Sequence, residues 1–179
     1  MMLLKKQDRS TGRFIIFLPP DIFMSAYIIE ITLKKNLFDA FGNEILHSIR
    51  ELGIDGIEKV YVYDVYKVYG DVDISTVRKI GRELLLDSVS QTMKVYRFDS
   101  KRKCKNPCVE VWYLPGVSDP VALTAMKGIR DLGIKNQLNI NCGKRYEFIG
   151  KKLNRKTLET ISTKILANTL IHQFIIKGI

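Results

Sequence analysis

Hydrophobic and polar residues run through the same series of patterns twice along this chain. Each series opens with an apolar run rich in β-branched and aromatic residues, at 27–33 and again at 109–114. Such runs are typical of strands with one buried face. Apolar residues at helical spacing come next, which predicts an amphipathic helix. In the first series these residues are Phe38, Phe41, Ile45, Ile49 and Leu52.

Polar residues and glycines indicate where each of these helices begins and ends. Asp39 can accept a backbone N–H as the N-cap, and Gly53 can take the left-handed conformation that ends the helix. In the second series Asp119 is the corresponding cap, Pro120 occupies the first helical position, and Gly133 ends the helix. The two predicted helices therefore have matching bounds.

The rest of each series predicts two short strands, a second helix and a last strand. The short strands are 60–63 and 65–69 in the first series, and 138–141 and 145–149 in the second. The second helices begin at Ser75 and Asn154, and the last strands span 91–96 and 172–176. A turn at 142–144 joins the short strands of the second series, because Gly143 suits a position that needs positive φ.

The two series are copies of one another in sequence as well as in pattern. Residues 49–54 (IRELGI) recur as 129–134 (IRDLGI), an offset of 80, and Tyr66 matches Tyr146 at the same offset. Self-similarity at a fixed offset indicates an internal repeat. The order β-α-β-β-α-β is the ferredoxin-like pattern, an antiparallel sheet with two helices on one face. The predicted fold is therefore α+β, with two tandem ferredoxin-like units.

The repeat divides the chain into two units, 24–98 and 109–179, joined by a basic connector at 99–108. Each unit would leave one sheet face without its own helices, and burial favours covering that face with the other unit. We therefore expect an intramolecular pseudo-dimer, and a homodimer is the open alternative. Residues 1–23 lack a sustained period and are expected to form an irregular extension, with Met24 as a candidate natural start.

Positive charge is concentrated in one part of the chain. The 179 residues carry a formal net charge of +10. Residues 24–96 hold nine basic and eleven acidic side chains, whereas 97–108 hold five and one, and 109–179 hold eleven and five. A basic second unit would suit a nucleic acid. The nucleic-acid alternative is weakened, however, because the aromatic residues that could stack on bases lie in the slightly acidic first unit. They are Tyr61, Tyr63, Tyr66 and Tyr69.

Side chains that commonly carry catalysis or bind metals form no recognisable set in the sequence. Cys104 and Cys108 could supply two metal ligands, but no second close pair completes a tetrahedral site. Incidental thiols in a connector are the favoured interpretation. His47 and His172 do not occupy matching repeat positions, and the recurring aspartates are explained as helix caps.

Cysteine count and hydropathy limit the setting in which the chain is expected to work. Three cysteines give no disulfide framework. No apolar run approaches the roughly 20 residues that a membrane helix needs. A reduced, cytoplasmic setting is therefore expected.

An ordered set of short motifs occurs in both units. In the second unit they are 111–114 (VWYL), 116–120 (GVSDP), 132–134 (LGI), 142–146 (CGKRY) and 166–171 (LANTLI). In the first they are 52–58 (LGIDGIE), 62–66 (VYDVY) and 83–87 (ELLLD). Together these motifs resemble the PurS family, the small subunit of phosphoribosylformylglycinamidine synthase. Two such units in tandem are similar to the N-terminal region of synthases in which PurS-like modules are fused ahead of the catalytic PurL part.

The resemblance implies a noncatalytic subunit or region of an ATP- and glutamine-dependent C–N ligase of de novo purine biosynthesis. It would scaffold a PurL-type synthetase part and a PurQ-type glutaminase part, and assist the transfer of ammonia between them. On this basis the chain carries no catalytic residue and binds no cofactor or metal, and ATP and Mg bind only on the catalytic partner. A tandem nucleic-acid-binding protein and a small-molecule-sensing regulatory protein are the alternatives.

Charge and expected exposure single out one candidate surface for a partner protein. It combines the predicted turn of the second unit with the entry to that unit's second helix. Its residues are Gly143, Lys144, Arg145, Lys151, Lys152, Arg155 and Lys156.

Overall fold

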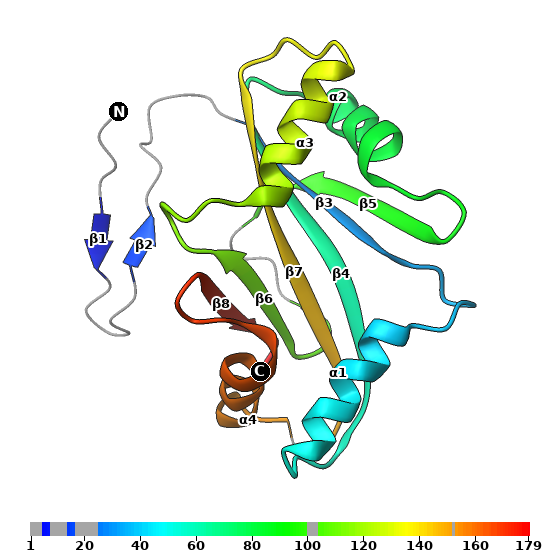
Figure 1. Cartoon of the computed structure of the whole chain (residues 1–179), viewed down its shortest axis with the longest axis vertical. Helices are drawn as coiled ribbons and strands as arrows, with labels where there is room; N and C mark the ends of the chain where they lie inside the picture. Colours follow the sequence, from blue (N-terminus) through cyan, green and yellow to red (C-terminus); the bar gives the residue numbers. More distant parts are fainter. Residues whose placement is uncertain (1–4, 8–13, 17–24, 100–103, 152) are drawn as a thin grey trace.

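The computed structural model describes residues 5–7, 14–16, 25–99, 104–151 and 153–179. Its main feature is one antiparallel sheet of six strands in the order β5-β3-β4-β7-β6-β8. Helices of both units lie against one face of this sheet, and the long strands β4 and β7 run side by side through its centre (Figure 1). The chain is therefore α+β with two repeated units, as predicted.

The first unit supplies three strands and two helices. These are β3 (Ser25–Leu33), α1 (Ala40–Glu51), β4 (Ile57–Gly70), α2 (Ile74–Ile80) with the π-helical turn η1 (Gly81–Leu85), and β5 (Gln91–Arg97). The second unit repeats this order. Its elements are β6 (Cys108–Tyr113), α3 (Pro120–Asp131), β7 (Leu138–Gly150), α4 (Arg155–Ile161) with the π-helical turn η2 (Ser162–Leu166), and β8 (His172–Lys177).

The predicted caps determine where the first helix of each unit begins and ends. The side chain of Asp39 accepts the N–H of Gly42 at 2.7 Å, and that of Asp119 accepts the N–H of Ala122 at 2.9 Å. Gly53 and Gly133 follow the helices with φ of 73° and 76°. The bounds predicted from local sequence are thus confirmed at both ends.

The prediction of two short strands in the middle of each unit is wrong. Residues 57–70 form the single strand β4 and residues 138–150 form the single strand β7. These strands pair with each other in an antiparallel register that places Asp64 opposite Lys144. Side chains alternate between the two sheet faces both in one long strand and in two shorter strands joined by a turn. The pattern of apolar and polar residues alone therefore could not distinguish the two arrangements. Each unit is therefore β-α-β-α-β.

The expected pseudo-dimer forms within the chain, but its geometry differs from the prediction. The units do not stack sheet on sheet; they join edge to edge through β4 and β7 to make one continuous sheet. Side chains from alternate positions of these strands, such as Val68 and Phe148, point to the helix-covered face and are fully buried. Both units therefore share one helical layer.

Each hydrophobic core contains residues of both units. One core packs α3 of the second unit with α2, β3 and the end of β4 of the first. The other packs α1 of the first unit with α4, β6 and the end of β7 of the second. One isoleucine on each helix is almost fully buried, with relative exposure of 1% or less: Ile49, Ile80, Ile129 and Ile161. Because the first helix of each unit covers the other unit, neither core is complete within one unit.

Parts of the predicted organisation fall at the margins of the described chain. Residues Lys5–Gln7 (β1) and Phe14–Ile16 (β2) pair as a two-stranded antiparallel sheet, so the extension is not irregular at these positions. The hypothesis that Met24 is the natural start lies outside the described residues. The last residue of the predicted connector, Cys108, belongs to β6. In the described part of the chain, no helix is long and apolar enough to cross a membrane.

Candidate functional site

The seam between β4 and β7 is where the predicted partner residues of the second unit meet the first unit. Gly143, Lys144 and Arg145 lie in the middle of β7, not in a turn. Since successive side chains of a strand point to opposite faces, Lys144 and Arg145 are separated by the sheet. The six residues of extended chain from Arg145 to Lys151 also span about 20 Å at ~3.3 Å per residue, so the predicted surface is not one patch.

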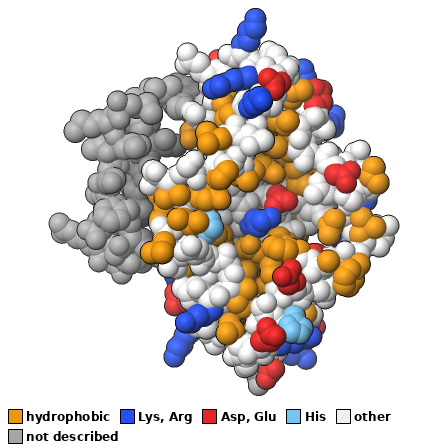
Figure 2. Space-filling model, viewed as in Figure 1, with side chains coloured by type: hydrophobic (Ala, Val, Ile, Leu, Met, Phe, Trp, Pro, Cys, Tyr) orange, Lys and Arg blue, Asp and Glu red, His pale blue; other side chains and the backbone are white. Residues whose placement is uncertain are grey.

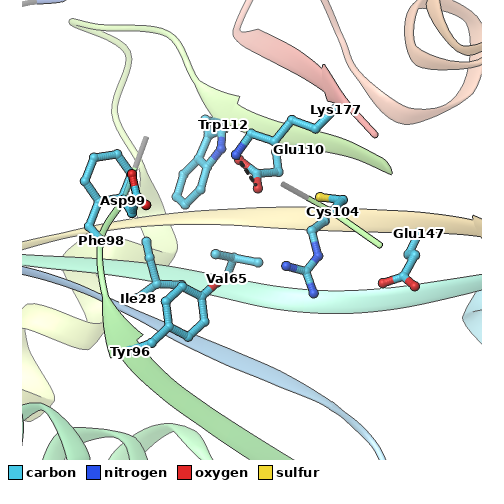
Figure 3. A pocket seen from close by; sticks show the side chains of 11 residues that line it. Ile28, Val65, Tyr96, Phe98, Asp99, Cys104, Glu110, Trp112, Glu147 and Lys177 are labelled. Carbon is cyan, nitrogen blue, oxygen red and sulfur yellow. Dashed lines mark hydrogen bonds and ion pairs between the residues drawn. The ribbon is translucent and has the colours of Figure 1, made fainter. Parts of the chain in front are cut away.

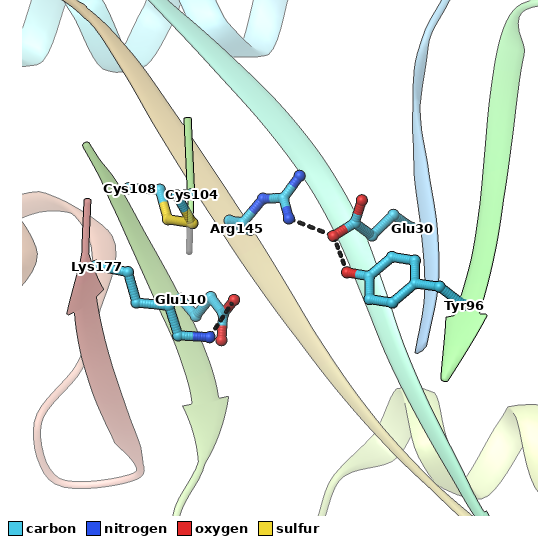
Figure 4. A network of polar contacts seen from close by, with 7 residues as sticks. All are labelled: Glu30, Tyr96, Cys104, Cys108, Glu110, Arg145 and Lys177. Carbon is cyan, nitrogen blue, oxygen red and sulfur yellow. Dashed lines mark hydrogen bonds and ion pairs between the residues drawn. A yellow bond between two sulfur atoms is a disulfide. The ribbon is translucent and has the colours of Figure 1, made fainter. Parts of the chain in front are cut away.

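Arg145 is buried on the face opposite the helices, where it joins the two units. Its guanidinium donates to the carboxylate of Glu30 in β3, and the same carboxylate accepts from the hydroxyl of Tyr96 in β5 (Figure 4). Glu30 is 3% exposed and Arg145 is 9% exposed. The prediction that Arg145 is an exposed contact residue is therefore wrong. Strand parity places its side chain on the sheet face opposite the helices, where Glu30 and Tyr63 contact it.

The surroundings of Arg145 stabilise its charge. Burial disfavours the charged guanidinium, but the negative charge of Glu30 and its hydrogen bond outweigh that effect and raise the pKa of Arg145. The guanidinium also lies over the ring of Tyr63, with its central carbon Cζ 4.2 Å from the ring centroid. Tyr63 belongs to β4, so this contact also joins the units.

A second ion pair on the same face lies within the second unit. The Nζ atom of Lys177 in β8 is 2.9 Å from Glu110 in β6 (Figure 4). Cys104 and Cys108 form a disulfide close to it, so the prediction of incidental thiols without a disulfide is wrong. A spacing of four residues could have suggested this link once Cys108 was placed at the start of a strand.

A small cavity lies between these two charge networks. Its lining includes Tyr96, Trp112 and Arg145, together with carboxylates of Glu110 and Glu147 (Figure 3). The buried Nε atom of Arg145 has no hydrogen-bond partner among the described residues. The cavity volume is about 80 Å³, far below the roughly 300–1,000 Å³ of sites that bind cofactors or drug-sized ligands. It therefore suits water rather than a nucleotide.

On the helix-covered face the seam carries a different pair. The Nζ atom of Lys144 is 2.6 Å from Asp64, and both side chains are about two-fifths exposed, at 44% and 39%. Lys144 also lies 5.3 Å from the ring centroid of Phe41 on α1. Figure 2 shows this face, with hydrophobic side chains spread over its middle and a few charged ones among them.

Apolar side chains around the start of α1 are exposed, and two of them, Phe38 and Phe41, belong to the apolar stripe predicted for this helix. Leu37, Phe38 and Phe41 are 42%, 79% and 46% exposed, and we call these three residues the aromatic shoulder. Phe38 precedes the cap Asp39, so it lies outside the helix and its spacing could not place it on the buried face. The repeat equivalents in the second unit are the smaller Val117, Ser118 and Val121.

The basic residues at the entry to α4 remain accessible. Lys151, Arg155 and Lys156 are exposed, and Arg155 forms an ion pair with Glu159 at 3.1 Å. Lys152 lies outside the described residues. We call the three described residues the basic entry. The basic entry is the part of the predicted partner surface whose residues are exposed, as the prediction assumed.

The two histidines and the free cysteine make contacts that fit a structural role. His47 is largely exposed next to Glu51, and His172 packs against Tyr113 with ring centroids 4.7 Å apart. Burial raises the pKa of the free thiol of Cys142, which makes it a poor nucleophile. Among the described residues, no group of three or more His, Cys, Asp or Glu side chains could hold a metal ion.

The four tyrosines of β4 do not form one stacking surface. Tyr66 packs into a core on the helix-covered face, whereas Tyr61, Tyr63 and Tyr69 have the opposite parity. Of these, Tyr63 is covered by Arg145. The arrangement gives no support to the nucleic-acid alternative.

Comparison with known proteins yields one finding for each unit. The family model described as PurS, phosphoribosylformylglycinamidine (FGAM) synthase, matches residues 26–99 and again residues 107–178. These two matches coincide with the two structural units and leave out residues 100–106, between β5 and β6. No curated protein matches the chain by sequence.

Proposed function

Since the chain belongs to the PurS family of FGAM synthase and contains two units of that family, we propose that it scaffolds this enzyme in purine biosynthesis. It would hold a PurL-type synthetase part and a PurQ-type glutaminase part together, so that ammonia passes from one to the other. The chain itself would contribute no catalytic residue.

The observation that carries this proposal is that two units sharing one continuous sheet have different exposed surfaces. The first unit offers the aromatic shoulder, and the second unit offers the basic entry. Exposed aromatic side chains are enriched among the residues that dominate binding at protein interfaces. An apolar surface and a basic surface fit two different neighbours, as a scaffold between two proteins requires.

Association with the two partner proteins tests the aromatic shoulder. The variant Phe38→Ser/Phe41→Val gives the first unit the residues that the second unit has at the equivalent positions. We expect it to weaken the binding of one partner about tenfold or more, because truncating a central aromatic contact costs ~2 kcal/mol or more. Val121→Ala at the equivalent position of α3 is the matched control and should leave binding nearly unchanged. Unchanged binding by the double variant would remove the shoulder from the proposal.

The basic entry calls for a charge-reversal variant. Lys151→Glu/Lys156→Glu should weaken the binding of the other partner, and the loss should be larger at low salt because exposed charges are screened beyond about 10 Å at 0.1 M salt. The second unit's Lys127→Glu/Lys135→Glu, on α3 and after it, is the control for net charge. Equal losses in both variants would mean that total charge, not this surface, controls association.

The site of nucleotide binding follows from the same proposal. We expect ATP and Mg to bind to the catalytic partner. In this chain the cavity beside Arg145, of about 80 Å³, is too small for a nucleotide, so the hollow of about 370 Å³ beside the start of α4 is the place where nucleotide binding would contradict this expectation. Thermal unfolding of the isolated chain should therefore be unchanged by ATP with Mg. A saturable rise in the melting temperature would contradict this part of the proposal.

A further inference from the structure

The internal repeat and the register of the seam together define a pseudo-twofold axis. From the first strand through the seam strand, the repeat relates each residue of the first unit to the residue 80 positions later, and the seam pairs Asp64 with Lys144, which are 80 positions apart. Each is therefore the repeat equivalent of the other. Their neighbours follow the same rule, since Tyr63 is opposite Arg145 and Val65 is opposite Gly143. The axis thus passes through the Asp64–Lys144 pair.

The two residues on this axis carry opposite charges. Their side chains meet at 2.6 Å between Nζ and Oδ1. If the first unit paired with another copy of itself, two Asp64 carboxylates would meet on the axis. If the second unit paired with its own copy, two Lys144 ammonium groups would meet there. Like charges directly opposite one another across a strand pair are destabilising.

Away from the axis, the buried charged residues also differ between the two units. Glu30 and Glu110 are repeat equivalents, but the counterpart of Arg145 is Val65. Glu30 receives its cation from the other unit, whereas Glu110 receives Lys177 from its own unit. In a pair of two first units, Glu30 would face Val65 and keep only Tyr96 as a partner.

In a pair of two second units, Arg145 would instead be the residue without its counter-charge. Arg145 would then lose the carboxylate of Glu30 and have beside it Glu110, which is already paired with Lys177. The ring of Tyr63 that covers Arg145 would also be replaced by Gly143, its repeat equivalent. A buried charge that loses its counter-charge is strongly destabilising.

We propose that these four positions make the β4–β7 seam a heterotypic interface: a first unit pairs with a second unit and rejects its own kind. Asp64 and Lys144 supply this selectivity on the axis, and Glu30 and Arg145 supply it in the interior. The tandem chain is thereby protected from exchanging like units between copies, and its two outer surfaces are kept different.

Charge exchange in the full chain tests the proposal. Asp64→Lys places two lysines on the axis, Lys144→Asp places two aspartates there, and the double exchange restores the pair with its polarity reversed. From urea titrations we expect each single variant to raise the unfolding equilibrium constant about tenfold, and the double exchange to return it to within about threefold of the native value. Additive effects of the two substitutions would overturn the inference, since a role in packing alone predicts no rescue.

Co-purification of differently tagged full chains measures the choice of pairing partner separately from stability. When the Asp64→Lys and Lys144→Asp chains are unfolded and refolded together, exchange of units between chains brings lysine opposite aspartate. They should co-purify more than two tagged native chains treated in the same way, and more than either variant mixed with itself. Co-purification no greater than in these controls would overturn the inference.

Discussion

The two units of this chain build the same elements and differ where they face each other. Both have a first helix of 12 residues and a second helix of seven, which a five-residue π-helical turn prolongs. Along the seam, in contrast, Asp64 stands opposite its equivalent Lys144, and Arg145 occupies the position of Val65. One pattern of apolar positions therefore specifies the fold, whereas a few charged positions specify which unit pairs with which.

The largest expected effect comes from removing the cation that only the second unit supplies. Arg145→Val introduces the first unit's residue and leaves the buried carboxylate of Glu30 without a counter-charge. We expect a loss of ~3–5 kcal/mol in the free energy of unfolding, measured by urea titration. Adding Glu30→Leu to this variant should recover much of the loss, because the unpaired charge is then removed.

The matched change in the other ion pair should cost less. Lys177→Met removes the cation beside Glu110, and Lys177 and Glu110 are 24% and 14% exposed, so water can reach them. Equal losses for Arg145→Val and Lys177→Met would show that the cross-unit pair has no special role.

A smaller effect is expected where the units exchange large and small residues. A Cβ atom at Gly143 would lie 2.6 Å from the backbone oxygen of Val111 and 2.7 Å from the ring of Trp112. The first unit has Tyr63 and Thr32 at the positions of Gly143 and Trp112. Gly143→Ala should therefore cost ~1–3 kcal/mol through overcrowding.

The control for this change replaces Trp112 by threonine, the residue that the first unit has at that position. In the Trp112→Thr background the contact with the ring is gone and the contact with the Val111 oxygen remains, so Gly143→Ala should cost less than in the native chain without becoming neutral. The same cost in both backgrounds would contradict the assignment of the strain to Trp112.

The smallest expected difference is in alkaline stability, where the units are alike. Burial raises the pKa of both Tyr66 and its equivalent Tyr146 to about 12. A folded-state pKa above the unfolded value of about 10 means that the stabilisation is complete below pH 10 and is lost between pH 10 and pH 12. Tyr66→Phe and Tyr146→Phe should each reduce the loss of stability over that interval. The check is urea titration at pH 9 and pH 11; an unchanged pH dependence in both variants would contradict it.

Local sequence was sufficient for the first helix of each unit and for its ends. Asp39, Asp119, Gly53 and Gly133 act through contacts within a few residues, so their roles can be inferred without knowing the fold. The repeat itself also needed only the sequence. The family resemblance followed from the same local motifs and is confirmed by the family match to both units.

The seam could not be predicted because it depends on contacts distant in the chain. Gly143 has the sequence signature of a turn, yet it is required by the close approach of β6. Reading 138–150 as one strand would have placed Lys144 and Arg145 on opposite faces, but nothing local distinguishes that strand from a hairpin. The partner of Arg145 is 115 positions away, and the packing of α1 over the second unit is equally nonlocal.

The most direct test of the proposed function is FGAM formation by a PurL-type synthetase and a PurQ-type glutaminase, with and without this chain. Glutamine and free ammonia are supplied in turn as the nitrogen source. The account predicts that the chain raises the glutamine-dependent rate at least about tenfold, as effective-concentration gains from tethering allow, with a much smaller effect on the ammonia-dependent rate. The chain alone should show no activity. A glutamine-dependent rate that is unchanged by the chain would contradict the account.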